Sequence, residues 1–208
     1  IEEMAGVDIL CSDKTGTLTK NQLTLGEPIL FASTDPQEVI LAGALASKIE
    51  DRDAIDTAVL GALRDPNVLG SHKQLKFAEL AHPTDADAAK VKQTVEDLGS
   101  KGYRALGVAR SEDDGATWRL LGILPMFDPP RDDSKQTIDL ANAKGVRVKM
   151  ITGDDTAIAR ETARQLGLGT NIIPAAEAFP KDMDPDHVPP AIAEAIEKAD
   201  GFARVFPE

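Results

Sequence analysis

The loop from Ser12 to Thr19 directly follows an apolar run, and it constrains the fold more than any other stretch. The run Val7–Cys11 is typical of a buried strand, and Gly16 and three threonines then break the pattern. Asp13 therefore stands at the carboxyl end of a predicted strand, on a sheet rim where open α/β folds bind ligands. A carboxylate there can hold a divalent cation or attack a phosphoryl group. The plainer alternative is a loop aspartate that caps a turn.

The composition is typical of a globular protein. Apolar residues make up 42% and charged residues 28% of the 208 residues, which suits one large or two small domains. The net charge of -12 argues against nucleic acid as a partner, because that requires a basic surface. Cys11 is the only cysteine, which excludes an internal disulfide, and we expect it to be a small core residue. No apolar run approaches the roughly 18 residues of a membrane span, and residues 1–4 are not a signal peptide, so we expect the chain alone to be soluble.

Hydrophobic periodicity, proline and glycine divide the chain into predicted elements. The expected helices cover about residues 36–45, 54–63, 85–101, 132–143, 156–166 and 191–199. The expected strands cover 7–11, 23–25, 103–110, 117–124, 146–151 and, more weakly, 75–77, and a last apolar stretch covers 202–206. We expect the strands at 103–110 and 117–124 to form a hairpin and residues 167–190 to be a loop.

A second predicted strand end carries polar residues, Thr152-Gly153-Asp154. Thr152 offers a hydroxyl and Gly153 a backbone N–H to a phosphoryl oxygen, at a helix N-terminus where the dipole favours anions. The alternative for this motif is a helix cap, since Asp is a good N-cap residue.

Two adjacent prolines mark a junction at Asp128-Pro129-Pro130-Arg131, because they exclude regular structure there. Helices and strands alternate after residue 131, which predicts a parallel sheet. The middle of the chain, with its hairpin, is expected to be a separate insert.

The string Asp-Lys-Thr-Gly-Thr-Leu-Thr, from Asp13 to Thr19, resembles the phosphorylation motif of the P-type ATPases, ion pumps that form an aspartyl-phosphate. The resemblance covers nearly the whole chain and is closest to the plasma-membrane proton pump branch. It includes residues 1–21, 54–58, 103–109, 121–131, 149–154 and 164–171. It implies a haloacid-dehalogenase-like, Rossmann-type α/β fold with a parallel sheet. Residues 1–25 and 128–208 would form the phosphorylation domain, and residues 26–127 an inserted α+β nucleotide-binding domain.

The resemblance also implies roles for the matching residues. Asp13 accepts the phosphoryl group of ATP, and Asp13 and the carbonyl of Thr15 hold Mg²⁺. The phosphate and nucleotide would be bound by Lys14, Thr15, Thr152, Gly153, Asp154, Arg131 and Asp56. Asp56 matches the acidic residue that faces the adenine amino group, and its alternative is a solvated helix face.

The residue at position 15 distinguishes the pumps from the phosphatases of this superfamily. Many phosphatases of the haloacid-dehalogenase-like superfamily, which the chain also resembles, carry a second Asp two residues after the nucleophile as general acid and base. Thr15 has no comparable acid, so we expect a long-lived aspartyl-phosphate that suits energy coupling.

The chain departs from the family pattern in several places. It lacks the Lys-Gly-Ala motif and the stacking Phe of the nucleotide domain, and a piece of that domain is expected to be missing between Phe77 and about Ala81. We expect the Gly-Asp-Gly-Xaa-Asn-Asp motif, the phosphate-clamping lysine and the actuator domain of the family to lie outside these 208 residues. This chain alone is therefore expected to bind ATP weakly and not to turn over.

The expected partners are ATP and the membrane and actuator domains of the same polypeptide, at the cytoplasmic face of the plasma membrane. Two alternatives remain beside the catalytic part of a proton pump. One is a stand-alone phosphatase-type hydrolase of the same superfamily, and the other is a non-catalytic remnant that binds nucleotide or a partner.

Overall fold

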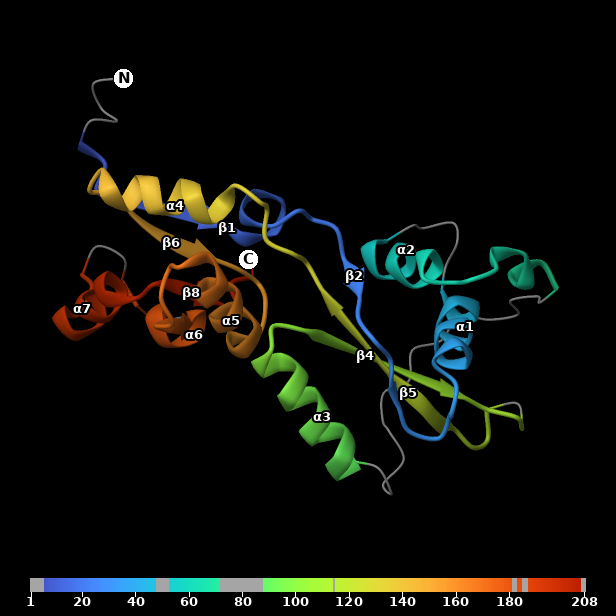
Figure 1. The fold of residues 1–208 in the computed structure, drawn as a ribbon. Helices are drawn as coiled ribbons and strands as arrows, with labels where there is room; N and C mark the ends of the chain where they lie inside the picture. The colour runs from blue at the N-terminus through green and yellow to red at the C-terminus, as the bar shows by residue number, and fades with distance from the viewer. Residues whose placement is uncertain are drawn as a thin grey trace. The chain divides into compact units, whose positions relative to one another are not determined.

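The computed structural model describes residues 6–47, 53–71, 88–113, 115–180, 183–184 and 187–206. The chain divides into two compact units. The parallel-sheet unit comprises residues 1–21, 100–102 and 128–208, and the antiparallel-sheet unit comprises residues 22–99 and 103–127 (Figure 1). The predicted strand at 75–77 and the gap expected after Phe77 lie outside the described residues.

Four strands form the parallel sheet in the order β1-β6-β8-β7. They are β1 (Ile9–Asp13), β6 (Arg147–Ile151), β8 (Gly201–Ala203) and β7 (Ile172–Pro174). All three pairings are parallel, which confirms the sheet predicted from the alternation of helices and strands. Because parallel strands point the same way, all four carboxyl ends meet at one rim.

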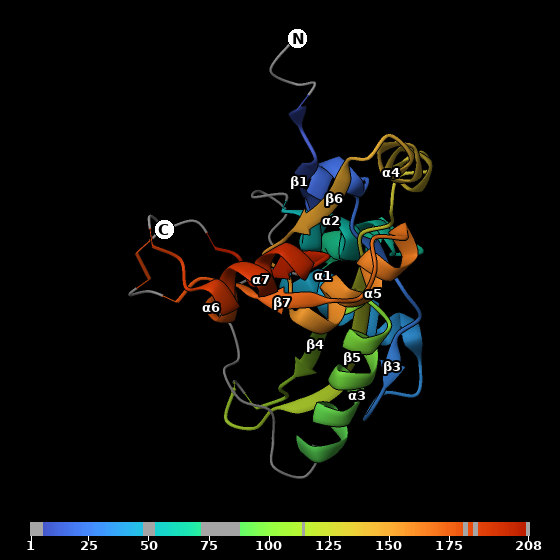
Figure 2. The same cartoon turned by 90° about the vertical axis from the view of Figure 1, so that its left-hand side faces the viewer.

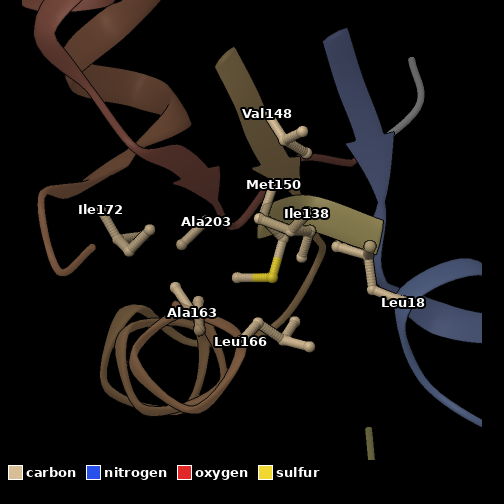
Figure 3. Close-up of a cluster of buried hydrophobic side chains, with 9 residues drawn as sticks. Leu18, Ile138, Val148, Met150, Ala163, Leu166, Ile172 and Ala203 are labelled. Atoms are coloured by element: carbon tan, nitrogen blue, oxygen red, sulfur yellow. The ribbon is translucent and has the colours of Figure 1, made fainter. Parts of the chain in front are cut away.

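Helices cover both faces of this sheet (Figure 1, Figure 2). α4 (Ser134–Ala143) and α5 (Thr156–Leu166) pack on one face, and α6 (Ala175–Ala178) and α7 (Pro190–Lys198) on the other. Side chains alternate between these faces along each strand. Met150, Ile172 and Ala203 therefore join the first core (Figure 3), whereas Ile151, Ile173 and Phe202 join the second.

The antiparallel-sheet unit is built around β5 (Arg119–Phe127). β5 pairs with β2 (Thr24–Leu25), β3 (Ile29–Leu30) and β4 (Arg104–Arg110), and the pairing with β4 confirms the predicted hairpin. Three helices, α1 (Pro36–Ala46), α2 (Ala54–Gly61) and α3 (Ala88–Ser100), and the 3₁₀ turn η3 (Pro66–Ser71) complete the unit. Its core joins apolar residues of α1 and α2 to β4 and β5.

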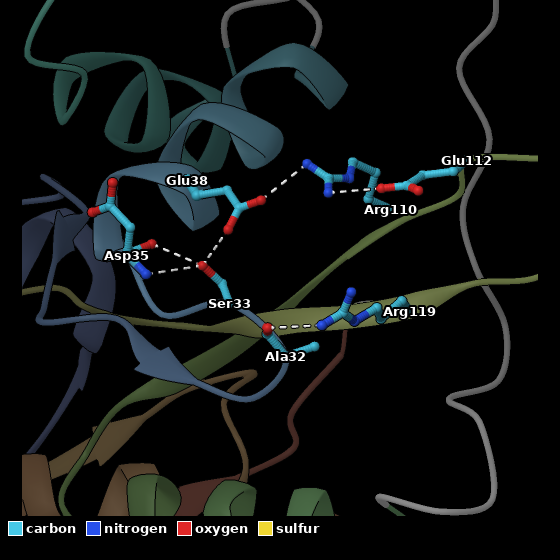
Figure 4. Close-up of polar contacts among 7 residues, drawn as sticks. All are labelled: Ala32, Ser33, Asp35, Glu38, Arg110, Glu112 and Arg119. Carbon is cyan, nitrogen blue, oxygen red and sulfur yellow. Dashed lines mark hydrogen bonds and ion pairs between the residues drawn. The ribbon is translucent and has the colours of Figure 1, made fainter.

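A polar network fixes the start of α1 to the hairpin (Figure 4). Asp35 caps α1 by accepting from the backbone N of Gln37 at 2.9 Å. Glu38 accepts from the Ser33 hydroxyl at 2.5 Å and from Arg110 Nη1 at 2.9 Å. The helix predicted from Asp35-Pro36 is therefore confirmed, and its first turn is held by β4.

A buried lysine from the neighbouring strand caps the C-terminal end of α7. Lys149, on β6, donates its ammonium to the carbonyl oxygens of Ile196 at 3.0 Å, of Glu197 at 2.7 Å and also of Ala199. These are carbonyls that a helix end leaves without partners. Burial lowers the pKa of Lys149, and the nearby Arg147 lowers it further.

Three expectations are wrong. Cys11 is exposed rather than in the core, because β1 is an edge strand of the described sheet, and its neighbour Leu10 is 49% exposed. Residues 167–190 are not only loop, since they contain β7 and α6. The second helix ends at Gly61, and a separate turn follows at Pro66.

None of the described helices is both long and apolar enough to cross a membrane.

Candidate functional site

Asp13 is the last residue of β1, as its sequence position predicted. It pairs in register with Ile151, the last residue of β6, so Thr152-Gly153-Asp154 begin at the neighbouring strand end. The Asp13 side chain is exposed and caps no backbone group of the turn that follows. The turn-capping alternative is therefore wrong, and the carboxylate faces solvent on the sheet rim.

The turn η2 (Lys14–Leu18) shapes the backbone after Asp13. Thr15 is extended, and Gly16 has φ +80°, a left-handed conformation that favours glycine. The turn closes where the Lys14 carbonyl accepts from the backbone N of Thr19 at 3.0 Å and from its hydroxyl at 3.1 Å. This geometry keeps Thr15 exposed beside Asp13.

Asp13 and Thr15 offer oxygen atoms at this rim, the ligand type that Mg²⁺ prefers. Among the described residues, no three His, Cys, Asp or Glu side chains gather closely enough to hold a metal by themselves. Mg²⁺ is usually bound by one or two carboxylates together with water and substrate phosphates. The Asp13 carboxylate and the Thr15 carbonyl are such a partial donor set.

The loop after β6 is held by the chain that leaves β8. The backbone N of Thr152 donates to Phe202 O, and the backbone N of Val205 donates to Thr152 O, both at 3.0 Å. A Cβ atom at Gly153 would lie 3.3 Å from the Val205 carbonyl oxygen, so a side chain would crowd the backbone there. Thr152 is buried, whereas Gly153 is exposed on the rim.

Lys14 and Asp154 form an ion pair between the two loops. Lys14 Nζ lies 2.8 Å from Asp154 Oδ2, and the side chains are only 5% and 2% exposed. Asp154 does not cap α5, as the alternative for this motif supposed. The cap is Asp155, whose carboxylate accepts from the backbone N of Ala157 at 3.0 Å.

Arg204 also lies on this rim, and our sequence reasoning missed it. It directly follows β8, has φ +54° and donates its backbone N to Asp154 O at 2.9 Å. Its guanidinium pairs with Asp155, which lowers the pKa of that carboxyl. The signal was a basic residue inside the last apolar stretch, 202–206, where a third strand ends as the strands before Asp13 and Thr152 do.

Two predicted site residues remain, one in each unit. Arg131 is in the parallel-sheet unit, where its backbone N donates to Leu18 O at 3.1 Å and its exposed guanidinium contacts Asp133 at 3.4 Å. Asp56 belongs to the antiparallel-sheet unit, in the first turn of α2, and is half-buried. The sheet rim thus gathers six of the eight predicted residues, Asp13, Lys14, Thr15, Thr152, Gly153 and Asp154.

Comparison with known proteins agrees with this geometry. The model of the haloacid dehalogenase-like hydrolase family matches residues 7–199. The plasma membrane ATPase of Kluyveromyces lactis is 41% identical over 254 aligned positions, which cover the whole chain and 28% of that protein. Plasma membrane ATPase 1 of Saccharomyces cerevisiae is also 41% identical, with 27% of its length covered. The chain therefore spans about a quarter of the length of these relatives.

Solved structures share the fold. A zinc-transporting PIB-type ATPase in its E2.Pi state superposes with a TM-score of 0.56 at 26% identity, over 81% of this chain and 29% of that one. The same kind of ATPase in its E2P state gives 0.53 at 24% identity, with the same coverage. Together with the parallel sheet, these likenesses confirm the predicted α/β fold of the haloacid-dehalogenase-like type.

Proposed function

The chain belongs to the haloacid dehalogenase-like hydrolase family, and from this premise we propose that it is the catalytic portion of an ATP-driven P-type proton pump. The observation that carries the proposal is the exposed Asp13 carboxylate at the end of β1, which caps no backbone group. Thr152 and Gly153 follow the end of the neighbouring strand, β6. The whole-chain similarity to plasma membrane ATPases supports it. The choice of the proton rests on the resemblance to the plasma-membrane branch.

The reaction uses Asp13 as nucleophile. One carboxylate oxygen of Asp13 attacks the γ-phosphorus of ATP, the bond from that phosphorus to the bridging oxygen breaks, and ADP leaves. Thr152 and Gly153 donate a hydroxyl and a backbone N–H to the phosphoryl oxygens. Mg²⁺, held by Asp13 and the Thr15 carbonyl, would supply positive charge against the phosphates.

We assign Arg131 and Asp56 to the nucleotide, with the residues of the antiparallel-sheet unit as its binding domain. Membrane and actuator domains of the same polypeptide would be the partners, at the cytoplasmic face of the plasma membrane. These assignments extend the family resemblance.

Phosphoryl labelling tests the proposal. The chain is incubated with Mg²⁺ and either γ-labelled ATP or labelled acetyl phosphate, which needs no nucleotide site, and then quenched in acid. We expect acid-stable, hydroxylamine-labile label from acetyl phosphate, less from ATP, and none in Asp13→Asn. Thr15→Asp adds the acid that phosphatases carry, so the label should decay faster.

Two results would replace this proposal. Fast hydrolysis of small phosphate esters without accumulated label, abolished in Asp13→Asn, would favour the stand-alone phosphatase. Absence of label from both donors would favour a non-catalytic remnant.

A further inference from the structure

We propose that Lys14 and Asp154 are a positioning pair that ties the loop of the nucleophile to the loop of Thr152, and that the Lys14 ammonium is not a phosphate ligand. This inference rests on the proposed function of Asp13, and it reassigns both residues from the set expected to bind phosphate and nucleotide. It starts from the 2.8 Å contact between Lys14 Nζ and Asp154 Oδ2.

Burial makes the contact between the two charges energetically important. With side chains 5% and 2% exposed, both charges have lost most of their water. A buried charge without its partner is strongly unfavourable, so each group holds the other in place. A phosphoryl group that took Lys14 away would remove the ion-pair partner of the buried Asp154 carboxylate, whereas Gly153 is exposed on the rim and free to contact it.

Backbone hydrogen bonds connect Lys14 and Asp154 to the rest of their loops. The Lys14 carbonyl closes η2 by accepting from Thr19 N at 3.0 Å. On the other side, Asp154 O accepts from Arg204 N at 2.9 Å, and Asp154 N donates to the Thr152 hydroxyl oxygen at 3.1 Å. Movement of either charged side chain therefore strains the turn after Asp13 and the loop after β6 together.

The pair also orients Thr152. Its hydroxyl oxygen accepts from Asp154 N, and among the described residues it donates to no acceptor. Its proton therefore remains for a phosphoryl oxygen on the rim. Lys14 and Asp154 act on the reaction through Thr152 and Asp13, without touching the substrate themselves.

An exposed ion pair in the same unit provides the control. Lys20 Nζ lies 2.9 Å from Asp132 Oδ1, but these side chains are 37% and 92% exposed. Exposed pairs contribute little, so Lys20→Met should leave both loops unchanged.

The test compares Lys14→Met, Asp154→Asn, the double variant and Lys20→Met in the whole chain, with circular dichroism to confirm folding. Amide hydrogen exchange should rise about tenfold or more at Thr19 in Asp154→Asn, and at Arg204 in Lys14→Met, each in the loop opposite the substitution. Acetylation by acetic anhydride should modify Lys14 at least about tenfold more slowly than Lys20, and Asp154→Asn should remove much of that difference.

The labelling assay adds a functional measurement. Both single variants should lose labelling of Asp13 from acetyl phosphate, and the double variant should regain most of it because it leaves no buried charge unpaired. A phosphate-binding lysine would instead leave the double variant as poor as Lys14→Met, which would overturn the proposal. Equal acetylation of Lys14 and Lys20, or unchanged exchange at Thr19 in Asp154→Asn, would overturn it too. If the wild-type chain takes no label, the proposed function fails, and exchange and acetylation still decide the pair.

Discussion

Asp155 serves two partners at the N-terminus of α5. Its carboxylate caps the helix through Ala157 N and also pairs with Arg204. We expect Asp155→Ala to lower the free energy of unfolding by about 1–2 kcal/mol, mostly through the lost cap, because exposed ion pairs add little. Asp155→Asn keeps an acceptor for the cap and should cost less. Urea unfolding at pH 7 measures both.

The same residue predicts a pH dependence. The hydrogen bond from Arg204, and then that from Ala157 N, lower the pKa of Asp155 from its ordinary value of 3.8. A carboxyl with a lowered pKa stabilises the folded state above its unfolded pKa, and this contribution disappears as pH falls through the folded pKa. The gap between wild type and Asp155→Asn should therefore narrow when unfolding is measured near pH 3. A gap of the same size at both pH values would contradict this assignment.

Single residues were predictable where the chemistry is local. Asp13 and Thr152-Gly153 follow apolar runs, and the structure places them at adjacent strand ends. Cys11 was misjudged because exposure depends on whether a strand lies at the sheet edge, which the strand's own residues do not encode. The ion pair between Lys14 and Asp154 was not predicted either, because the two residues lie far apart in the sequence.

At the scale of elements, Lys149 links β6 to α7. Lys149→Met would leave the carbonyls of Ile196, Glu197 and Ala199 without their donor. An unsatisfied buried polar group costs about 1–3 kcal/mol, so we expect a loss of that order and faster amide exchange in α7. Lys198→Met is the control, because the Lys198 ammonium is exposed and pairs with the exposed Glu194 on the same helix. Equal effects of the two substitutions would refute the capping role.

Helices with clear end signals were predicted closely. α5 runs from Thr156 to Leu166 as expected and ends at Gly167 with φ +76°. β7 was missed because its three residues, Ile172–Pro174, form a strand only by pairing with β8. Short strands carry little periodicity, and a distant partner decides them.

At the scale of the whole molecule, the fluorescence of one tryptophan allows the unfolding of one unit to be followed apart from that of the other. Trp118 is the only tryptophan, and it lies in the antiparallel-sheet unit. Its fluorescence should follow that unit alone, whereas far-UV circular dichroism follows both. Mg²⁺ with acetyl phosphate should stabilise the parallel-sheet unit, which holds Asp13, and shift only the second signal. One coincident transition that shifts as a whole would show that the units unfold together.

The proline junction at residues 128–131 and the hairpin before it predicted that one unit is inserted into another. The structure divides the chain after residues 21 and 127. Whether the two units are the phosphorylation and nucleotide-binding domains stays a prediction, because that depends on ligands rather than on packing.

The pairing of β1 with β6 has a consequence for synthesis on the ribosome. Ile9 pairs with Arg147, so the strand that ends in the nucleophile leaves the ribosome long before its partner exists. At about 5–20 residues per second, β1 waits roughly 7–28 s for β6. Throughout that interval β1 has no strand to pair with, while the antiparallel-sheet unit, which is encoded between β1 and β6, can already fold. β1 therefore stays unpaired for most of the synthesis of this chain.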